Sequence, residues 1–307
     1  MNKILVTPRS ITSAGWHPAL DKLKASGYEV VFSKAGELPG ESDLVRLLPG
    51  CVAYLAGVER ISSTVLKAAT ALKVISRNGV GTDGIDMDAA EGLAIKVLNA
   101  PGSNARGVAE LAMAFIFSAA RSIAYSDSMI KDQQWTRRMG AELKGKTLGV
   151  IGCGRIGKEL SLMALAIGMK VTAYEPGSQG FFTYDDRFSY ASLDAVVSGS
   201  DFISLHCPPA ADGKPIVDRA FLWNMKAGAS VINTARGELV DEDEVLAALT
   251  EGTLGAYATD VYVEEPPFSS KLFRHKQVIC TAHIGGYTSE SVDRAMEDAV
   301  NNILKNL

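Results

Sequence analysis

The chain has 307 residues, of which 47% are hydrophobic and 21% charged, and its formal net charge is -4 with a pI near 5.7. These values exclude a disordered or fibrous chain and leave room for two domains. Acidic and basic residues are interspersed without a basic block, so we expect a small-molecule partner and neither nucleic acid nor an anionic membrane surface.

The N-terminal segment predicts a cytoplasmic protein. Met1–Pro8 contains the strand-like run Ile4-Leu5-Val6 and lacks the basic region and long apolar stretch of a secretory signal. No uninterrupted apolar run along the chain reaches the length that spans a bilayer, so no membrane contact is expected.

Between residues 3 and 98, short runs typical of β-strands alternate with helical segments. The helix at Pro18–Ser26, for example, places Leu20 and Leu23 on one face and ends before Gly27. Alternation at this pace predicts a parallel sheet covered by helices on both faces. The expected strands are Ile4–Thr7, Glu29–Phe32, Val52–Ala56, Lys73–Ser76 and Ile95–Leu98, with further helices at Ser42–Leu48, Ser63–Ala69 and Met87–Gly92.

A Pro-Gly-Ser segment at residues 101–103 interrupts this alternation, and a long helix follows with Ser103 or Asn104 as its N-cap. Its apolar residues keep helical spacing to about Arg121, which makes it a candidate interdomain hinge or subunit contact. The more polar stretch Ser122–Lys146, with Trp135, is either an arm that reaches a partner subunit or a surface loop. We expect a homodimer.

A second alternating series begins at Thr147–Ile151 and predicts a second parallel sheet. The last helix, Thr288–Leu307, has apolar residues at helical spacing and is expected to cross back to the first domain. We therefore divide the chain into one domain of residues 1–100 with 286–307 and an inserted domain of residues 101–285. The later strands expected in the second series are Lys170–Tyr174, Asp201–Leu205, Ser230–Thr234, Ala256–Thr259 and Gln277–Thr281.

The segment Gly152-Cys153-Gly154-Arg155-Ile156-Gly157 lies between an apolar strand and an apolar helix, and it has the GxGxxG spacing of a dinucleotide-binding turn. Gly152 would permit the tight turn, Gly154 the close approach of backbone to a pyrophosphate, and Gly157 the packing of helix on strand. The N–H groups at the helix N-terminus, around Arg155 and Ile156, would then face the phosphates.

Glu175 ends the next strand, 18 residues after Gly157. A carboxylate there accepts hydrogen bonds from the adenosine ribose hydroxyls and repels a 2′-phosphate. The residues Pro176–Gln179 include no Arg or Lys to receive such a phosphate, so we predict NAD over NADP. A solvated Glu at a strand end is the alternative interpretation.

The four cysteines lack CxxC spacing and stand singly in apolar or Gly/Pro contexts. This pattern predicts reduced, buried thiols, with neither a disulfide frame nor a metal site. Three of them would lie near strand ends beside the cofactor cleft, so a thiol that reacts when the cofactor is absent is a second interpretation. They are Cys51 and, near the strand ends, Cys153, Cys207 and Cys280.

Arg236, Glu265 and His283 each follow what reads as a buried strand. Because the carboxyl ends of parallel strands meet at one edge of a sheet, where open α/β folds bind ligands, we expect these side chains to converge. A lone histidine is more often a satisfied core residue, but its pairing with Arg236 and Glu265 favours catalysis. With the glycine turn, the three residues indicate a dinucleotide-dependent dehydrogenase.

These residues belong to stretches that occur together, in this order, in a known family. The chain resembles the D-isomer-specific 2-hydroxyacid dehydrogenases, of the short phosphoglycerate dehydrogenase-like type, over about residues 50–290. The resemblance implies two Rossmann-like domains, an NAD-binding domain inserted into a substrate domain, and NAD as the cofactor. The matching stretches are Arg77–Asp83, Asn99–Asn104, Val108–Leu111, Gly152–Gly157, Asn233–Gly237, Asp260–Tyr262 with Glu265-Pro266, and His283–Gly286.

The resemblance implies that Arg236 binds the substrate's carboxylate and carbonyl oxygen, that His283 is the acid/base and that Glu265 orients it. A planar carboxylate suits the rigid guanidinium fork of arginine. Reduction of a carbonyl group gives its oxygen negative charge, so a proton must come from a group that titrates near neutrality. A carboxylate on the other imidazole nitrogen fixes the tautomer of that group.

The resemblance also assigns residues to substrate and cofactor. Asn78, Gly79, Val80 and Gly81 form a turn whose N–H groups at Val80 and Gly81 would cradle the substrate carboxylate. The nicotinamide would meet the side chain of Asp260 at its carboxamide. Thr234 and Ala235 would present backbone to its ring, and His206 would shape the pocket wall beside the further cofactor-binding residues Cys207, Pro208, Gly285 and Gly286.

Three features depart from the family's common pattern. Ala282 stands where Pro commonly precedes the histidine, which makes that loop less rigid. Glu175 stands where Asp is more usual, which lengthens the reach to the ribose. Nothing follows the final helix, so we expect neither the C-terminal regulatory domain of longer relatives nor serine feedback.

The leading hypothesis is an NAD-dependent D-2-hydroxyacid dehydrogenase. Its substrate is expected to be 3-phosphoglycerate or a relative, with hydroxypyruvate, glyoxylate or another 2-oxo acid as the further candidates. Arg9, Arg60 and Arg77 would supply a site for a distal phosphate, or they are solvated surface charges. Two alternatives stay open. One is a formate dehydrogenase, which needs no proton donor, and the other is an NAD-sensing binding protein such as a transcriptional corepressor.

Overall fold

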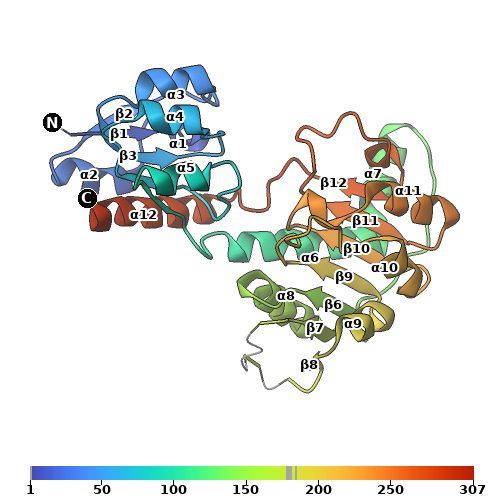
Figure 1. Ribbon diagram of the computed structural model, residues 1–307. Helices are drawn as coiled ribbons and strands as arrows, with labels where there is room; N and C mark the ends of the chain where they lie inside the picture. Colours follow the sequence, from blue (N-terminus) through green and yellow to red (C-terminus); the bar gives the residue numbers. More distant parts are fainter. Residues whose placement is uncertain (1, 178–181, 184) are drawn as a thin grey trace. The chain divides into compact units, whose positions relative to one another are not determined.

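The computed structural model describes residues 2–177, 182–183 and 185–307. The chain forms two compact units: unit 1 consists of Met1–Asn104 with Thr288–Leu307, and unit 2 of Ala105–Tyr287. Each unit has one parallel sheet with helices beside it, of five strands in unit 1 and seven in unit 2 (Figure 1). The predicted α/β class with two parallel sheets is thereby confirmed.

The sheet of unit 1 has the order β2-β1-β3-β4-β5, and all neighbouring strands are parallel. The strands are β1 Lys3–Val6, β2 Glu29–Phe32, β3 Cys51–Ala56, β4 Val74–Arg77 and β5 Lys96–Leu98. In this doubly wound order the winding reverses between β1 and β3, and such sheets bind ligands at the carboxyl edge of that switch point.

Helices cover both faces of this sheet. They are α1 Arg9–Ala14, η1 Pro18–Leu20, α2 Asp21–Ala25, α3 Glu41–Leu47, α4 Ser63–Ala68, α5 Met87–Gly92 and α12 Ser289–Asn306. Along β3, Tyr54 shares a core with residues of α3, α4 and α5, whereas Ala53 and Leu55 share a core with residues of α2 and α12. Successive strand residues thus serve opposite faces, as the two-residue period of a strand requires.

The last helix, α12, packs against unit 1 through one apolar face. Met296, Val300 and Ile303 are fully buried and belong to the core that includes Ile4 of β1. Their spacing places them along one side of the helix, where they remain out of contact with water. Thr288 caps the helix, because its Oγ1 accepts a hydrogen bond from the Ser291 backbone N–H at 3.1 Å.

The sheet of unit 2 has the order β12-β11-β10-β9-β6-β7-β8. The strands are β6 Thr147–Ile151, β7 Lys170–Tyr174, β8 Phe188–Tyr190, β9 Phe202–Leu205, β10 Ser230–Asn233, β11 Ala256–Thr259 and β12 Val278–Cys280. From β8 to β11 this is the order of dinucleotide-binding folds, with β12 added at one edge. The switch point lies between β6 and β9.

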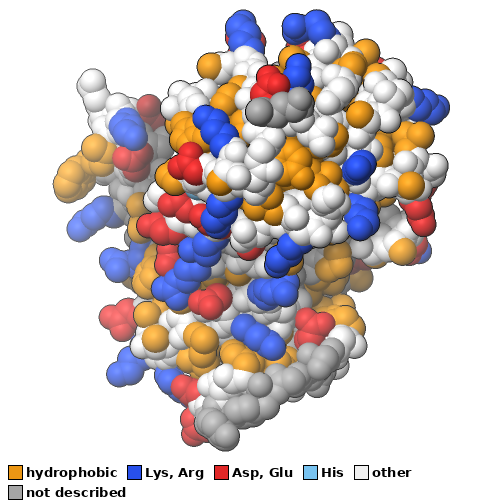
Figure 2. Space-filling model, turned by 90° about the vertical axis from the view of Figure 1, so that its left-hand side faces the viewer, with side chains coloured by type: hydrophobic (Ala, Val, Ile, Leu, Met, Phe, Trp, Pro, Cys, Tyr) orange, Lys and Arg blue, Asp and Glu red, His pale blue; other side chains and the backbone are white. Residues whose placement is uncertain are grey.

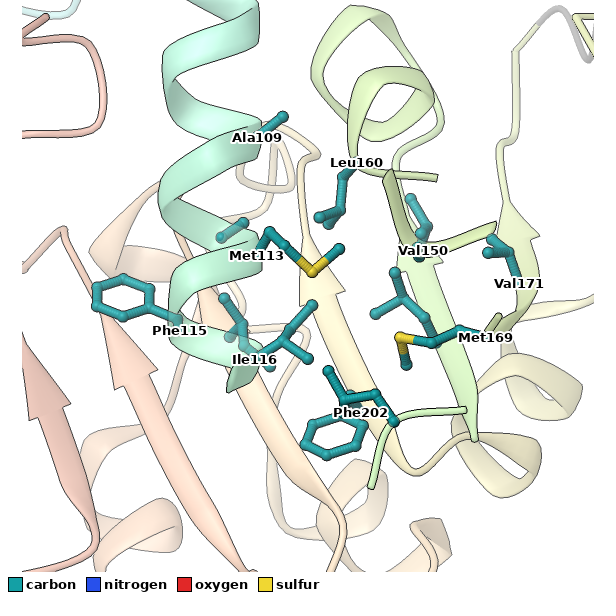
Figure 3. Close-up of a cluster of buried hydrophobic side chains, with 14 of the residues drawn as sticks. Ala109, Met113, Phe115, Ile116, Val150, Leu160, Met169, Val171 and Phe202 are labelled. Atoms are coloured by element: carbon teal, nitrogen blue, oxygen red, sulfur yellow. The ribbon is translucent and has the colours of Figure 1, made fainter. Parts of the chain in front are cut away.

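Two hydrophobic cores lie on opposite faces of this sheet. Unit 2 contains α6 Ala105–Arg121, α7 Ile123–Lys131, α8 Arg155–Ala166, α9 Leu193–Gly199, α10 Arg219–Asn224, η2 Gly237–Leu239, α11 Glu242–Glu251 and η3 Leu272–Arg274. Met113 and Ile116 of α6 share one core with Val150 of β6 and Leu160 of α8 (Figure 3). Residues of α9, α10 and α11 build the core on the opposite face. The long apolar stripe predicted for α6 is therefore buried within unit 2.

The structure adds short elements that the sequence pattern did not reveal. Helix α1 has six residues and strand β8 has three, too few for an apolar period to be recognised. The predicted helix Pro18–Ser26 is a 3-10 turn followed by the five-residue α2. The polar stretch after α6 begins as helix α7 rather than as a loop.

Surface charges of both signs are interspersed on the face shown in Figure 2. Within the described ranges, no single helix has the length and apolar character of a membrane span, although the bent pair α6 and α7 meets these criteria jointly.

The burial of α12 predicts a large stability loss on truncation of one of its core residues. Ile303→Ala should lower the free energy of unfolding by about 2–5 kcal/mol, because it removes apolar contacts and leaves a cavity. Urea unfolding measures this loss, with the exposed Asp298→Ala on the same helix as the control. A change below about 1 kcal/mol for Ile303→Ala would contradict the docking of α12 on the sheet.

Candidate active site

The glycine turn between β6 and α8 depends on contacts that only glycine permits. Gly152 has a φ of 92°, and a Cβ there would lie 2.6 Å from the carbonyl carbon of His206. A Cβ at Gly157 would lie 2.3 Å from the Gly152 carbonyl oxygen, so glycine lets α8 pack onto the turn. Around the Cβ position of Gly154, no described atom lies within 4 Å. The turn is therefore open to close approach by a ligand at its middle glycine.

This turn stands at the switch point of the unit 2 sheet, between β6 and β9. Helix α8 has 12 residues, and the N–H groups of its first turn, which begins with Arg155 and Ile156, have no acceptor within the helix. Such N–H groups bind anions, and the helix dipole adds to the attraction. The turn and α8 thus fit the pyrophosphate of a dinucleotide.

The strands on either side of β6 carry the other predicted cofactor residues. Glu175 directly follows β7, and its Oε1 accepts a hydrogen bond from the Gly177 backbone N–H at 2.9 Å. Cys207-Pro208 follows β9 on the other side. Ser178 and Gln179, which belong to the segment predicted to lack a phosphate-binding cation, lie outside the described residues.

The imidazole of His206 is enclosed at the end of β9. Its Nε2 lies 2.9 Å from Ser204 Oγ, and its Nδ1 is buried with no hydrogen-bond partner among the described residues. Burial lowers the pKa of His206 to about 4, so the ring is neutral at physiological pH. Its backbone carbonyl abuts Gly152, so His206 forms an uncharged wall beside the glycine turn.

Arg236 is positioned by the end of strand β10. The side chain of Asn233 donates a hydrogen bond from Nδ2 to the Arg236 carbonyl at 2.8 Å, and its Oδ1 accepts one from the Ala235 N–H at 3.0 Å. A Cβ at Gly237 would lie 2.2 Å from the Tyr262 carbonyl carbon, so the loop after β10 touches the loop after β11 backbone to backbone. This contact draws the Arg236 segment and the chain leading to Glu265 together.

His283 and Glu265 form a direct pair at this edge of the sheet. The distance from His283 Nδ1 to Glu265 Oε1 is 2.8 Å, and the two side chains remain 52% and 43% exposed. The pair is therefore both hydrogen-bonded and accessible to a ligand. The exposure also means that the contact serves orientation more than stability, because water screens ion pairs of this kind.

Asp260 holds the loop that carries His283. This buried carboxylate accepts hydrogen bonds from Thr281 Oγ1 at 2.5 Å, from the Ile284 N–H at 2.7 Å and from the Gly285 N–H at 2.7 Å. The three bonds bracket His283, whose φ of 53° lies in the left-handed region. Non-glycine residues seldom adopt that conformation, so the carboxylate stabilises an unfavourable backbone geometry at the histidine.

A cavity of about 600 Å³ lies beside the Glu265–His283 pair within unit 2. Its lining includes the aromatic rings of Tyr262, Phe268 and Phe273, together with both members of the pair. The Tyr262 and Phe273 rings meet edge to face with their centroids 4.9 Å apart. The imidazole and carboxylate therefore adjoin an apolar wall on one side, which favours their mutual hydrogen bond over bonds to water.

Two residues that support the loop before His283 received no role in the sequence analysis. Thr281 donates its hydroxyl to Asp260, and Tyr262 donates its phenol to the Thr281 carbonyl at 2.6 Å. Both act on the loop before His283. The sequence contains no motif that indicates these contacts. Tyr262 bonds to a backbone carbonyl, and the bond of Thr281 joins the ends of two adjacent strands.

Among the described residues, no cluster of three or more His, Cys, Asp or Glu side chains could hold a metal. All four cysteines are free. Desolvation by surrounding side chains raises the pKa of each thiol, that of Cys280 to about 11 although this residue is exposed. These thiols are protonated at neutral pH and are poor nucleophiles, which favours the interpretation as packing residues. The predicted burial is wrong for Cys280, which is exposed because β12 is an edge strand of the sheet.

The structure thus brings Arg236, Glu265, His283 and the predicted cofactor residues onto the carboxyl edge of one sheet in unit 2. The predicted substrate turn, Asn78–Gly81, lies at the corresponding edge of unit 1, directly after β4.

Comparisons with known proteins agree with this architecture. The model of the family "D-isomer specific 2-hydroxyacid dehydrogenase, NAD binding domain" matches residues 113–285. A hydroxypyruvate reductase of Thermotoga maritima is 37% identical over 273 residues, covering 87% of this chain and 88% of that protein. A D-3-phosphoglycerate dehydrogenase of Mycobacterium tuberculosis is 36% identical over 268 residues, covering 86% of this chain but only 51% of that protein. The TT0316 protein of Thermus thermophilus superposes with a TM-score of 0.87 at 31% identity, covering 98% of this chain and 96% of the other.

The chain belongs to the D-isomer specific 2-hydroxyacid dehydrogenase family. It is an NAD-dependent oxidoreductase, as the sequence resemblance implied, and the expectation of NAD as cofactor is confirmed. The matched NAD-binding segment lies entirely within unit 2 of this dehydrogenase, which also contains the glycine turn.

The neutral His206 predicts a pH-dependent stability of this dehydrogenase. The folded ring titrates near pH 4 and an unfolded histidine near 6.5, so between these values the unfolded chain binds the proton first and stability rises with pH. The contribution between pH 5 and pH 7.5 is about 2 kcal/mol. Urea unfolding of His206→Gln should show a pH dependence smaller by this amount than that of the wild type, and equal slopes would contradict a neutral, partly buried ring.

The contacts of Asp260 predict that its charge is needed for catalysis. In Asp260→Asn, an NH2 group replaces one of the two carboxylate oxygens, each of which accepts a hydrogen bond from a backbone N–H. The loop therefore loses one of these bonds, and we expect His283 to shift. We expect kcat for 2-oxo acid reduction to fall by about 10²-fold. Steady-state kinetics with the exposed Asp298→Asn as control measures the effect. An unchanged kcat for Asp260→Asn would mean that the loop keeps its geometry without the carboxylate.

Proposed function

We propose that this enzyme reduces a 2-oxo acid to a D-2-hydroxy acid with Arg236 as the substrate-binding residue, His283 as the acid/base and Glu265 as its orienting partner. The observation that carries the proposal is the 2.8 Å contact between His283 Nδ1 and Glu265 Oε1. A carboxylate on Nδ1 keeps the proton on that nitrogen and leaves Nε2 to exchange a proton with the substrate.

Bound NADH supplies the hydride that adds to the carbonyl carbon. The addition gives the carbonyl oxygen negative charge, which residues of this chain neutralise. His283 donates its Nε2 proton to the carbonyl oxygen, and in the oxidative direction it accepts the proton of the hydroxyl group. Arg236 binds the planar carboxylate through two parallel hydrogen bonds, which fixes the orientation of the reacting carbonyl.

We propose that the turn of Asn78, Gly79, Val80 and Gly81 in unit 1 binds the carboxylate of the substrate. The carbonyl of Gly79 accepts from the Ala100 N–H at 2.9 Å, and that of Val80 accepts from Asn99 Nδ2 at 2.7 Å. In a trans peptide the N–H points opposite to the carbonyl. The N–H groups of Val80 and Gly81 are therefore turned away from Asn99 and Ala100, which supports an anion-binding role.

In our proposal, successive parts of NAD meet successive strand ends along the carboxyl edge of the unit 2 sheet. The glycine turn binds the pyrophosphate and Glu175 the ribose, with Cys207-Pro208 at the pocket wall. We place the nicotinamide at the far end of the same edge, since the loops after β10, β11 and β12 carry the reacting groups there. The residues proposed for it are Thr234, Ala235, Asp260, Gly285 and Gly286.

The Glu265–His283 contact favours proton transfer over the two alternatives. Formate releases only a hydride, so a formate dehydrogenase has no use for a proton donor held by a carboxylate. An NAD-sensing binding protein has no need of the pair either. Reduction of any 2-oxo acid at the expense of NADH by the purified protein excludes a purely sensing role, and formate-dependent NADH production tests the other alternative.

For the substrate we propose a short 2-oxo acid, hydroxypyruvate or glyoxylate. The second candidate is 3-phosphoglycerate, a 2-hydroxy acid that the enzyme would oxidise. The hydroxypyruvate reductase is matched over 88% of its length, whereas the chain spans about half of the curated D-3-phosphoglycerate dehydrogenase. We also propose that residues 1–100 and 286–307 bind this substrate while residues 101–285 bind NAD. The four free thiols are consistent with a cytoplasmic location.

The proposal predicts the behaviour of two active-site variants. His283→Ala should lower kcat by about 10²- to 10⁴-fold, because the proton donor is lost, with NADH affinity little changed. Glu265→Gln should also lower kcat, while Glu264→Gln, which alters an exposed neighbour, should not. Steady-state kinetics and NADH fluorescence titration measure these effects. A near-normal kcat for His283→Ala would refute the assignment.

We further propose that the enzyme is a homodimer joined through the segment from α6 to residue 139. Phe117, Ile130, Trp135 and Met139 are all exposed there, the last two by 84% and 100%. Large apolar side chains gathered at one surface mark interaction sites. Light scattering should give twice the chain mass for the wild type.

Trp135→Ser combined with Met139→Ser should shift the dimer toward the monomer. Trp223→Ser is the matched control, because Trp223 on α10 is 87% exposed but lies outside the segment. A wild-type monomer, or equal effects of both changes, would overturn the proposed interface.

A further inference from the structure

The cavity beside the Glu265–His283 pair has no part in the reaction proposed above. Its volume of about 600 Å³ lies within the range of sites that bind small molecules. Residues from the loop after β11, from η3, from β12 and from the loop after β12 line it. Of the described residues, Arg236, Asp260 and those of the glycine turn are absent from this lining. The cavity therefore belongs to the outer edge of the unit 2 sheet, where β12 is the last strand.

Most of the lining is apolar or aromatic. Tyr262 donates its hydroxyl to the Thr281 carbonyl at 2.6 Å, so its contribution to the cavity is its ring rather than a free polar group. The ring of Phe273 meets it edge to face. Phe268 also lines the cavity and is 80% exposed, and an aromatic ring so exposed gains stability when a flat apolar ligand covers it.

The charge of the lining favours an anion. Arg274 lines the cavity, and its exposed guanidinium has no hydrogen bond or ion pair with any described residue. Lys271 and Lys276 stand within the same short segment, are exposed and likewise lack an ion pair with described residues, so the potential on this side is positive. The one carboxylate in the lining, Glu265, is bonded to His283. A ligand with a single negative group therefore has a cation to meet.

We propose that this cavity binds a small monocarboxylate with an aromatic body of one or two rings, the carboxylate at Arg274 and the rings against Phe268 and Phe273. A guanidinium holds a carboxylate through two parallel hydrogen bonds. A cavity of about 150 Å³ is enough for one benzene ring, and the present cavity is several times larger. The site goes beyond the proposed function, because binding here requires neither a 2-oxo acid nor the transfer of a hydride.

The bound acid acts on the acid/base pair, because Glu265 and His283 line the same cavity. Both side chains are about half exposed, and water screens their attraction. A ligand that replaces this water strengthens the attraction, so the protonated imidazole gives up its proton less readily. Saturating ligand should lower kcat for 2-oxo acid reduction by at least about twofold and change KM by less than about twofold. This consequence, unlike the binding, rests on the proposed function.

The binding test uses 2-naphthoate as the probe and 2-naphthamide as its neutral isostere, on the full chain saturated with NADH. Isothermal titration calorimetry should give a Kd below about 1 mM for 2-naphthoate. The amide should bind at least about fivefold more weakly, because it lacks the charge that Arg274 meets. Arg274→Gln and Phe268→Ser should each weaken binding of 2-naphthoate by about fivefold. Both residues are exposed, so these variants should fold. The matched controls Lys276→Gln and Val263→Ser change exposed neighbours outside the lining and should bind as the wild type does.

The thiol of Cys280 locates the probe, since this exposed residue lines the cavity. Bound 2-naphthoate should slow its alkylation by iodoacetamide by about fivefold, measured by peptide mass spectrometry. Binding that survives in Arg274→Gln but is lost in Arg236→Gln would place the probe at the substrate site and overturn the inference, as would an unprotected Cys280 or a wild type that does not bind. Protection of Cys280 with an unchanged kcat would refute the effect on the pair. Turnover of no 2-oxo acid by the wild type would refute the proposed function alone, since the binding measurements do not depend on it.

Discussion

The geometry of His283, the proposed acid/base, depends on one buried carboxylate. Both side-chain oxygens of Asp260 accept hydrogen bonds from the loop from Thr281 to Gly285. These bonds hold His283 in a left-handed conformation. The imidazole then reaches the Glu265 carboxylate, which comes from a different loop. Without Asp260 the loop would relax toward more common backbone angles, and the pair at 2.8 Å would separate. The His283–Glu265 pair is thus a property of two neighbouring strand ends, those of β11 and β12.

The two units place different side chains at the same architectural position. In unit 2 the switch point between β6 and β9 carries glycines and the neutral ring of His206, which suits the approach of phosphates to bare backbone. In unit 1 the switch point between β1 and β3 carries the enclosed carboxylate of Glu59. The first position leaves backbone N–H groups open to a ligand, and the second buries a carboxylate among hydroxyl and N–H donors. The contrast follows from side-chain chemistry alone, since both sheets are parallel and doubly wound.

Much of the fold was predictable because its signals are local. Strands such as Val52–Ala56 are continuous apolar runs, and α6 and α12 are long enough for their periodicity to be unambiguous. The glycine turn was recognisable from spacing, and the ends of three later strands identified Arg236, Glu265 and His283 as candidates. Those signals lie within single segments or at their ends.

The features that escaped prediction are contacts between segments. The hydrogen bond from Thr281 to Asp260 holds the loop of His283, and the carboxylate of Glu59 accepts hydrogen bonds from Thr7 and Tyr54. No sequence period connects the residues of either set. Short elements such as α1 and β8 were missed because tertiary packing, rather than an apolar period, stabilises them. Exposure at an edge strand, as at Cys280, likewise depends on the order of strands in the sheet.

The contact of Gly237 with the Tyr262 backbone limits how such an enzyme can be redesigned. Any side chain at position 237 would push apart the loops that present Arg236 and Glu265, so that part of unit 2 cannot be varied to change substrate preference. The loop after β3 in unit 1 has no comparable restriction at Val58 and Arg60, whose side chains are exposed. On the proposal that unit 1 binds the substrate, libraries aimed at new 2-oxo acids would vary these two positions and leave Gly237 and its neighbours in unit 2 intact.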